Sequence, residues 1–245
     1  GLTWKLIIEA GLWAEDMDIA GGILYAVGKK DFGLRRYDPA AGWTTVTPDN
    51  VQNLSEVAVD PSNPAMVYTV NGGFQQFFRS TDSGRTWTNL GTNTLGDKGR
   101  ANFQSTFGWK TTSTLRRWLS IGELVIDPHH RGRLWFAEGM GVWRSDDTLA
   151  SNDAPTFQDV SDGIEEMVTN DIVAMPGGKV VTAVWDRLGF IHTDLDKGPE
   201  TQLGLTNDFN SCWSLSTTPA NPRFVAAAVT HHIVHGKVFS GTSAD

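Results

Sequence analysis

The sequence contains one cysteine in 245 residues, Cys212, which excludes an internal disulfide and a multi-cysteine zinc cluster. It also lacks any run of about 18 apolar residues, the length that a membrane-spanning helix needs. Basic residues are in the minority, 20 Lys and Arg against 28 Asp and Glu, and they form no cluster suited to phosphates. We therefore expect no membrane partner, no nucleic-acid partner and no metal or other cofactor.

Apolar residues at helical spacing are nearly absent as well. Short runs rich in β-branched and aromatic residues recur between Gly, Pro, Asn and Asp, for example at 22–27, 55–59, 66–70 and 134–137. These runs predict an all-β chain. Because 40% of the residues are hydrophobic, the chain can bury a substantial core, which excludes intrinsic disorder.

One arrangement of these runs occurs twice along the chain. An Asp-Pro pair at 60–61 ends one strand-like run and precedes an Arg-Ser pair at 79–80. Asp-Pro at 127–128 and Arg-Ser at 144–145 repeat this order at nearly the same interval. A repeated unit of three or four short strands over roughly 40 to 50 residues predicts the four-stranded antiparallel blades of a β-propeller.

A complete motif at residues 80–87 indicates the type of propeller. Its sequence, Ser-Thr-Asp-Ser-Gly-Arg-Thr-Trp, resembles the Asp-box hairpin of sialidases, sortilin-like receptors and several glycoside hydrolases. In such a turn the Asp accepts hydrogen bonds from backbone amides, the Gly supplies a positive φ, and the Trp packs on a neighbouring strand. Residues 145–147, Ser-Asp-Asp, look like a decayed copy. The motif residues expected to be structural are Ser80, Asp82, Gly84, Thr86 and Trp87.

A second resemblance is more specific. Residues 163–172 read GIEEMVTNDI, and a later segment that begins at Asp186 reads Asp-x-x-Gly-Phe-x-His. This order is similar to that of glycoside hydrolase family 74, the xyloglucanases and oligoxyloglucan-specific cellobiohydrolases, and the similarity extends over most of the chain. The resemblance implies a secreted enzyme that hydrolyses xyloglucan or a related β-1,4-glucan, with Asp186 as its general acid.

The same resemblance implies a tandem of two seven-bladed propellers that form a cleft. Residues 1–160 would be the end of the first propeller, with the Asp-box blade at 52–92, and residues 161–245 the truncated start of the second. The remaining blades of a longer chain would then be partners of this one, together with the polysaccharide. The family's general base lies in a Thr-Asp-x-Gly-Gly segment that this sequence does not contain.

The implied inverting chemistry needs two carboxyl groups about 6.5 to 9.5 Å apart, one that donates a proton and one that activates water. A general acid must stay protonated until it donates, and apolar neighbours such as Trp185, Leu188 and Phe190 favour the neutral form. Flat tryptophan rings can stack on sugars. The tryptophans expected to contact substrate are Trp109, Trp118, Trp143 and Trp185.

Other candidate sites are weaker. Glu165 and Glu166 cannot act on one bond as an acid and base pair, because adjacent residues of a strand point to opposite faces. His231 and His235 share a strand face, but no carboxylate or thiol near them in sequence completes a metal site. The alternative function is a non-catalytic Asp-box propeller that binds a carbohydrate or another ligand. A second carboxylate facing Asp186 would distinguish the enzyme from the binding module.

Overall fold

The computed structural model describes residues 3, 7, 13–71, 76–91, 102–107, 109, 121–150, 154–164, 166–199, 201–203, 211–230 and 238–243. Its elements are strands and one short 3-10 helix, η1 (Lys30–Phe32). The all-β prediction is confirmed. Within the described ranges, no helix is long and apolar enough to cross a membrane.

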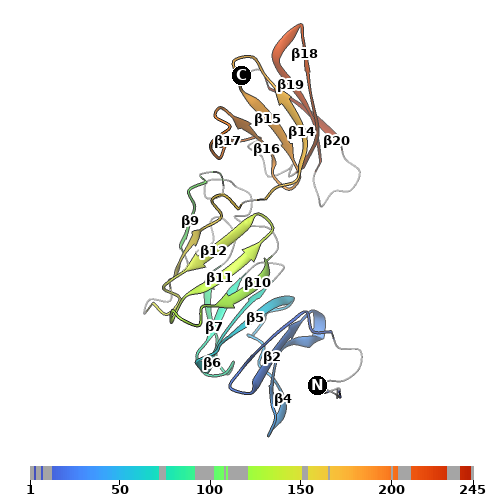
Figure 1. Ribbon diagram of the computed structural model, residues 1–245. Helices are drawn as coiled ribbons and strands as arrows, with labels where there is room; N and C mark the ends of the chain where they lie inside the picture. Colours follow the sequence, from blue (N-terminus) through green and yellow to red (C-terminus); the bar gives the residue numbers. More distant parts are fainter. Residues whose placement is uncertain are drawn as a thin grey trace. The chain divides into compact units, whose positions relative to one another are not determined.

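The chain divides into two compact units, of which unit 1 comprises residues 1–104 and 118–162. Unit 1 contains three sheets, and in the first two the antiparallel strands follow chain order (Figure 1). The first contains β1 (Asp16–Ala20), β2 (Ile23–Gly28), β3 (Gly33–Asp38) and β4 (Gly42–Thr45). The second contains β5 (Leu54–Asp60), β6 (Asn63–Asn71), β7 (Phe77–Ser80) and β8 (Thr88–Gly91). The third contains β10 (Ile121–Ile126), β11 (Leu134–Glu138), β12 (Gly141–Ser145), β13 (Thr156–Asp159) and, parallel to β13, β9 (Asn102–Gln104).

Unit 2 comprises residues 105–117 and 163–245 and contains two sheets. One has the order β14 (Thr169–Ala174), β15 (Val180–Val184), β16 (Leu188–His192) and β17 (Thr201–Gln202). The other has the order β18 (Ser211–Thr218), β19 (Asn221–Thr230) and β20 (Val238–Ser243). Consecutive antiparallel strands in each sheet are the pattern of propeller blades, as predicted. The fifth strand of the third sheet, β9, was not predicted and pairs with what would otherwise be an open edge.

Apolar side chains fill the space between successive sheets of each unit. In unit 1 the aromatic rings of Phe77 and Phe136 lie 5.0 Å apart, and Phe77 and Phe157 lie 5.3 Å apart. All three side chains are fully buried, and each contributes about 1.5–3 kcal/mol of burial free energy. The blade-on-blade core is therefore made by the inward residues of neighbouring sheets.

Acidic side chains also join the first strands of successive blades. Asp16 Oδ2 on β1 accepts a hydrogen bond from the backbone N–H of Val57 on β5 (2.8 Å). Asp171 Oδ2 on β14 accepts one from Leu215 on β18 at the same distance. That bond and the one from the Ile172 amide lower the pKa of Asp171. A carboxylate thus serves the same role between blades in both units.

The Asp-box turn follows β7. Asp82 Oδ1 accepts hydrogen bonds from the Ser80 hydroxyl and the Thr86 amide (both 2.8 Å), and its Oδ2 accepts one from the Thr86 hydroxyl (2.7 Å). These bonds, chiefly those from Thr86, lower the pKa of Asp82 to about 2. The carboxylate therefore organises the turn in its ionised form.

Two further motif residues connect this turn to the first sheet. Gly84 has a φ of 83°, and a Cβ there would lie 2.7 Å from the side chain of Val46. Trp87 donates its indole N–H to the carbonyl of Val46 (2.8 Å). Glycine is needed at this position for its backbone conformation and for the close approach of the blades.

The residues that resemble a decayed Asp-box form a related turn after β12. Asp147 Oδ1 accepts hydrogen bonds from the Ser145 hydroxyl and from the backbone N–H of Thr156 (both 2.8 Å). Thr156 lies nine positions beyond Asp147, whereas Thr86 lies four beyond Asp82. The carboxylate bonds are thus similar, although the segment they close is longer.

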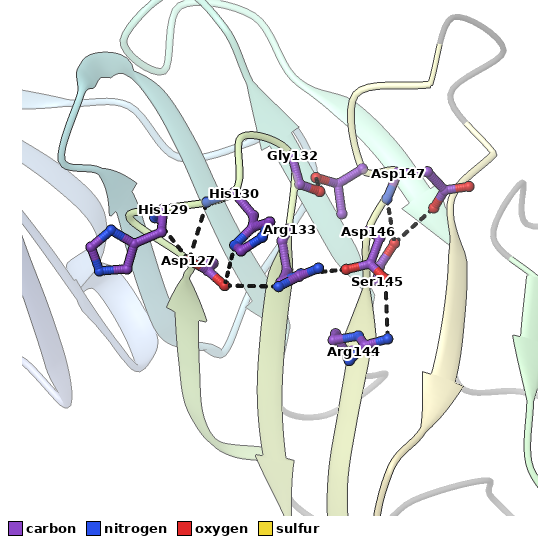
Figure 2. Close-up of polar contacts among 10 residues, drawn as sticks. Asp127, His129, His130, Gly132, Arg133, Arg144, Ser145, Asp146 and Asp147 are labelled. Atoms are coloured by element: carbon purple, nitrogen blue, oxygen red, sulfur yellow. Dashed lines mark hydrogen bonds and ion pairs between the residues drawn. The ribbon is translucent and has the colours of Figure 1, made fainter.

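An ion-pair network lies beside this second turn (Figure 2). Arg133 bridges Asp127 and Asp146, and Arg144 pairs with Asp146 at 3.2 Å. Asp127 also accepts the backbone N–H of His129 (2.8 Å), which is the main reason that its pKa is lowered to about 2. His129 is exposed on the turn. The charged side chains of Asp127, Arg133, Arg144 and Asp146 pair with one another, so the network is structural.

Candidate functional site

The general acid candidate lies in the three-residue turn between β15 and β16, where Val184 pairs with Leu188. Asp186 has a φ of 68° and Leu188 a φ of 63°, values that are uncommon for residues other than glycine. Gly189 follows with a φ of 148°, and a Cβ there would lie 1.8 Å from the carbonyl oxygen of Thr182. The turn stores backbone strain of the order of 1–3 kcal/mol per residue, a feature that clusters at functional sites.

The inner side of this turn is anchored by a buried cation. Arg187 is fully buried, and its guanidinium carbon lies 5.7 Å from the centre of the Trp109 ring. Its carbonyl accepts a hydrogen bond from Gln202 Nε2 (2.7 Å). Trp109 itself is 5% exposed and packs against Phe190 at 5.1 Å. The predicted sugar contact by Trp109 is therefore replaced by a structural role, because its ring supports the turn from beneath.

The outer side of the turn carries an exposed pair of tryptophans. Trp185 is 42% exposed, and its ring centre lies 6.1 Å from that of Trp213, which is 50% exposed. The two ring planes are inclined by 42°. Trp213 donates its indole N–H to Thr230 Oγ1 (2.8 Å), which holds the ring against β19. Sequence reasoning identified Trp185 but missed Trp213.

Backbone and side-chain hydrogen bonds connect the turn to its surroundings. Asp186, which is half-buried, donates its backbone N–H to Ser211 Oγ on β18 (3.2 Å). Trp185 donates its backbone N–H to the carbonyl of Val168 (2.9 Å). Asn170 Nδ2 donates to the Cys212 carbonyl (2.8 Å), one residue before Trp213. The site is therefore held by two consecutive blades of unit 2.

Two titratable groups in the blades that hold the turn are shifted towards their neutral forms. Burial lowers the pKa of His192, whose Nε2 lies 3.1 Å from Thr182 Oγ1. Burial also raises the pKa of the Cys212 thiol. A buried neutral thiol is a poor nucleophile, so Cys212 contributes packing rather than chemistry.

The remaining predicted residues lie elsewhere. Trp143 is fully buried in unit 1, stacked on Phe136 with centres 6.0 Å apart and planes inclined by 7°. The sugar contact predicted for it is wrong, because its ring exposes no face. Trp118, Glu165, His231 and His235 lie outside the described residues. In the part of the chain that the structure describes, no group of three or more His, Cys, Asp or Glu side chains is arranged to hold a metal ion.

Comparisons with known proteins find that the chain is similar to xyloglucanases. A xyloglucanase of Paenibacillus sp is 28% identical over 205 residues, which is 74% of this chain and 20% of the relative. A xyloglucanase of Acetivibrio thermocellus is 29% identical over 238 residues, 82% of this chain and 28% of the relative. No protein-family profile matches the chain.

Two solved structures share the fold. The GH74 xyloglucanase of Xanthomonas campestris superposes with a TM-score of 0.73 at 23% identity, covering 91% of this chain and 34% of its own. The GH74 enzyme of Niastella koreensis superposes with a TM-score of 0.68 at 22% identity, covering 93% and 36%. These comparisons confirm the resemblance to glycoside hydrolase family 74 and the propeller fold. The chain spans between 20% and 28% of the length of these two curated relatives.

Proposed function

We propose that the protein carrying this chain is an inverting glycoside hydrolase that cleaves xyloglucan or a related β-1,4-glucan, with Asp186 as its general acid. The observation that carries the proposal is the strained turn in which Asp186 lies between the exposed Trp185 and the buried Arg187. The similarity to xyloglucanases supports the substrate class. In this proposal the enzyme is secreted, and the chain supplies the end of one seven-bladed propeller and the start of a second.

The chemistry divides between two carboxyl groups. Asp186 would pass its proton to the glycosidic oxygen as the bond from that oxygen to the anomeric carbon breaks, which lets the oxygen leave as a neutral hydroxyl. A second carboxylate, outside this chain, would remove a proton from the water that attacks the opposite face of the sugar. Leu188 and Phe190 bury apolar side chains beside the turn and exclude water from that side.

The test is Asp186→Asn in the full-length protein, with the release of reducing ends from xyloglucan as the measurement. Asparagine adopts positive φ readily, so this variant keeps the turn, whereas alanine at a φ of 68° would add strain. We expect turnover to fall about 10²- to 10⁴-fold, because the general acid is lost. Binding of xyloglucan should be largely retained.

Asp194→Asn is the matched control. Asp194 follows the end of β16, whereas the Asp186 turn precedes its start, so the two aspartates lie at opposite ends of that strand. Asp194 is exposed and pairs with Lys197 at 2.9 Å. Its variant should retain wild-type turnover. Unchanged turnover in Asp186→Asn would refute Asp186 as the general acid. A wild-type protein that binds glucans without cleaving them would replace the enzyme with the non-catalytic binding propeller.

A further inference from the structure

The first strands of four blades contain an irregularity at the same place. The pairing register shifts between Leu54 and Glu56 on β5 and between Ile121 and Glu123 on β10. It shifts again between Thr169 and Asp171 on β14 and between Cys212 and Ser214 on β18. The extra residues at these β-bulges are Ser55, Gly122, Asn170 and Trp213. The bulge is thus a repeated feature of the blade, and the residue within it is variable.

Trp213 differs from the residues at the equivalent positions. Three blades place a small or polar residue at the bulge, whereas the β18 blade places the largest side chain there and leaves half of it exposed. An exposed tryptophan is not required by the bulge, since Ser, Gly and Asn form it as well. Bulges re-aim side chains and are frequent beside active sites. The presence of Trp at this position therefore indicates a role in binding a ligand rather than in forming the bulge.

The geometry favours a ligand with flat apolar faces. Because the two ring planes are inclined by 42°, one flat group cannot lie against both Trp185 and Trp213. Two successive rings of a chain, each on one indole, fit a centre-to-centre distance of 6.1 Å. The indole N–H of Trp213 already bonds Thr230, so this residue can interact with a ligand only through its ring carbons. Pyranose rings have such faces.

We propose that Trp185 and Trp213 form a two-ring platform on which successive glucosyl units of a neutral β-glucan stack beside Asp186, an inference that rests on the proposed function. The link to Asp186 is direct, because Trp185 precedes it and Ser211, which accepts the Asp186 amide, lies two residues before Trp213. The ligand is neutral because a chain with a net charge of −8 disfavours acidic polysaccharides.

The experiment measures the Kd of a xyloglucan oligosaccharide by calorimetry in the Asp186→Asn background, which prevents cleavage. Trp213→Ala should weaken binding about tenfold, because one stacking face is lost, and Trp185→Ala should do the same. Trp213→Phe keeps an aromatic face and should recover most of the affinity. Leu195→Ala is the control, since Leu195 is 70% exposed and follows the opposite end of β16. It should leave the Kd within about twofold.

The outcomes separate this inference from the proposed function. If Trp213→Ala and Trp213→Phe both keep the parent Kd, the platform is wrong, although hydrolysis by the wild type would still support Asp186. If Trp213→Ala alters self-association but not sugar binding, the surface is a protein contact and the platform is again wrong. If the wild type neither binds nor cleaves xyloglucan, both proposals fail. Polygalacturonate that binds as tightly as xyloglucan would overturn the preference for a neutral chain.

Discussion

Glu56 makes the stability of unit 1 dependent on pH. Glu56 lies on β5 and is half-buried. Burial, followed by the charges of Asp16, Glu123 and Glu15, raises its pKa from the ordinary value of 4.5 to about 7. These neighbours lie on or beside the first strands of the two flanking blades, so the folded state brings four carboxyl groups together.

The sign of the effect follows from proton binding in the two states. Below pH 4.5 Glu56 is protonated in both the folded and the unfolded chain, and its burial carries no charge penalty. Between pH 4.5 and about 7 the unfolded chain loses this proton while the folded chain retains it, so stability falls as pH rises. Above pH 7 the full cost persists. A shift of this size would correspond to about 3 kcal/mol if fully shielded, and solvent screening of a half-exposed group reduces it to about 1 kcal/mol.

Glu56→Gln removes the charge at every pH and should raise the free energy of unfolding by about 1 kcal/mol at pH 8, with no gain at pH 4. Thermal melts should show the difference as roughly 2–4 °C. Glu123→Gln removes one neighbouring charge and should give a smaller, non-additive gain. Glu166 in unit 2 is exposed, so Glu166→Gln is the control and should change stability at neither pH. An equal gain at both pH values would refute the electrostatic explanation, and a loss at pH 8 would refute burial of the charge.

Two further predictions concern carboxylates that organise turns and blades. Asp82→Ala should destabilise unit 1 by about 1 kcal/mol at pH 7, a value reduced for solvent exposure. In thermal melts this loss of stability should vanish as the pH falls from 3.8 towards 2, because the pKa of Asp82 is lowered in the folded chain. The control Asp49→Ala changes an exposed position and should show no loss of stability that depends on pH in this way. Asp171→Ala leaves the amide of the buried Leu215 without its carboxylate acceptor and should cost about 1–3 kcal/mol. Hydrogen exchange at the Leu215 amide should accelerate in this variant. An unchanged exchange rate would contradict the inter-blade role, and so would an equal acceleration in the exposed control variant Asp196→Ala.

The Asp-box turn could be predicted from sequence because its bonds are local. Asp82 bonds residues two positions before and four positions after it, so the motif contains its own geometry. The second turn could be recognised only in part. Ser145 and Asp147 match the motif, but the amide that completes the turn belongs to Thr156, beyond an insertion that spacing rules do not anticipate.

The tryptophans could not be assigned from sequence, because burial depends on the neighbouring blade. Trp143 and Trp213 both lie on strands among small or polar residues. Trp143 is covered by Phe103 and Phe136, from β9 and β11, so its ring joins the core. Trp213 lies at a β-bulge and stays exposed, and the bulge can be recognised only once the pairing of the strands is known. Comparison of the first strands of the blades with one another is the signal that could have found it.

The candidate site lies where the repeated blade departs from regularity. The bulge exposes the side chain of Trp213. Positive φ values at Asp186 and Leu188 bend the adjoining turn, and the buried side chain of Arg187 holds that turn in place. Each departure costs conformational free energy that the paired strands around it offset. The regular strands need only apolar inward faces, so many sequences can form them. The irregular positions tolerate fewer residues, and a loss of Gly189 should therefore disrupt the pairing of β16 with β15 beside the turn, because a Cβ there would collide with the Thr182 carbonyl.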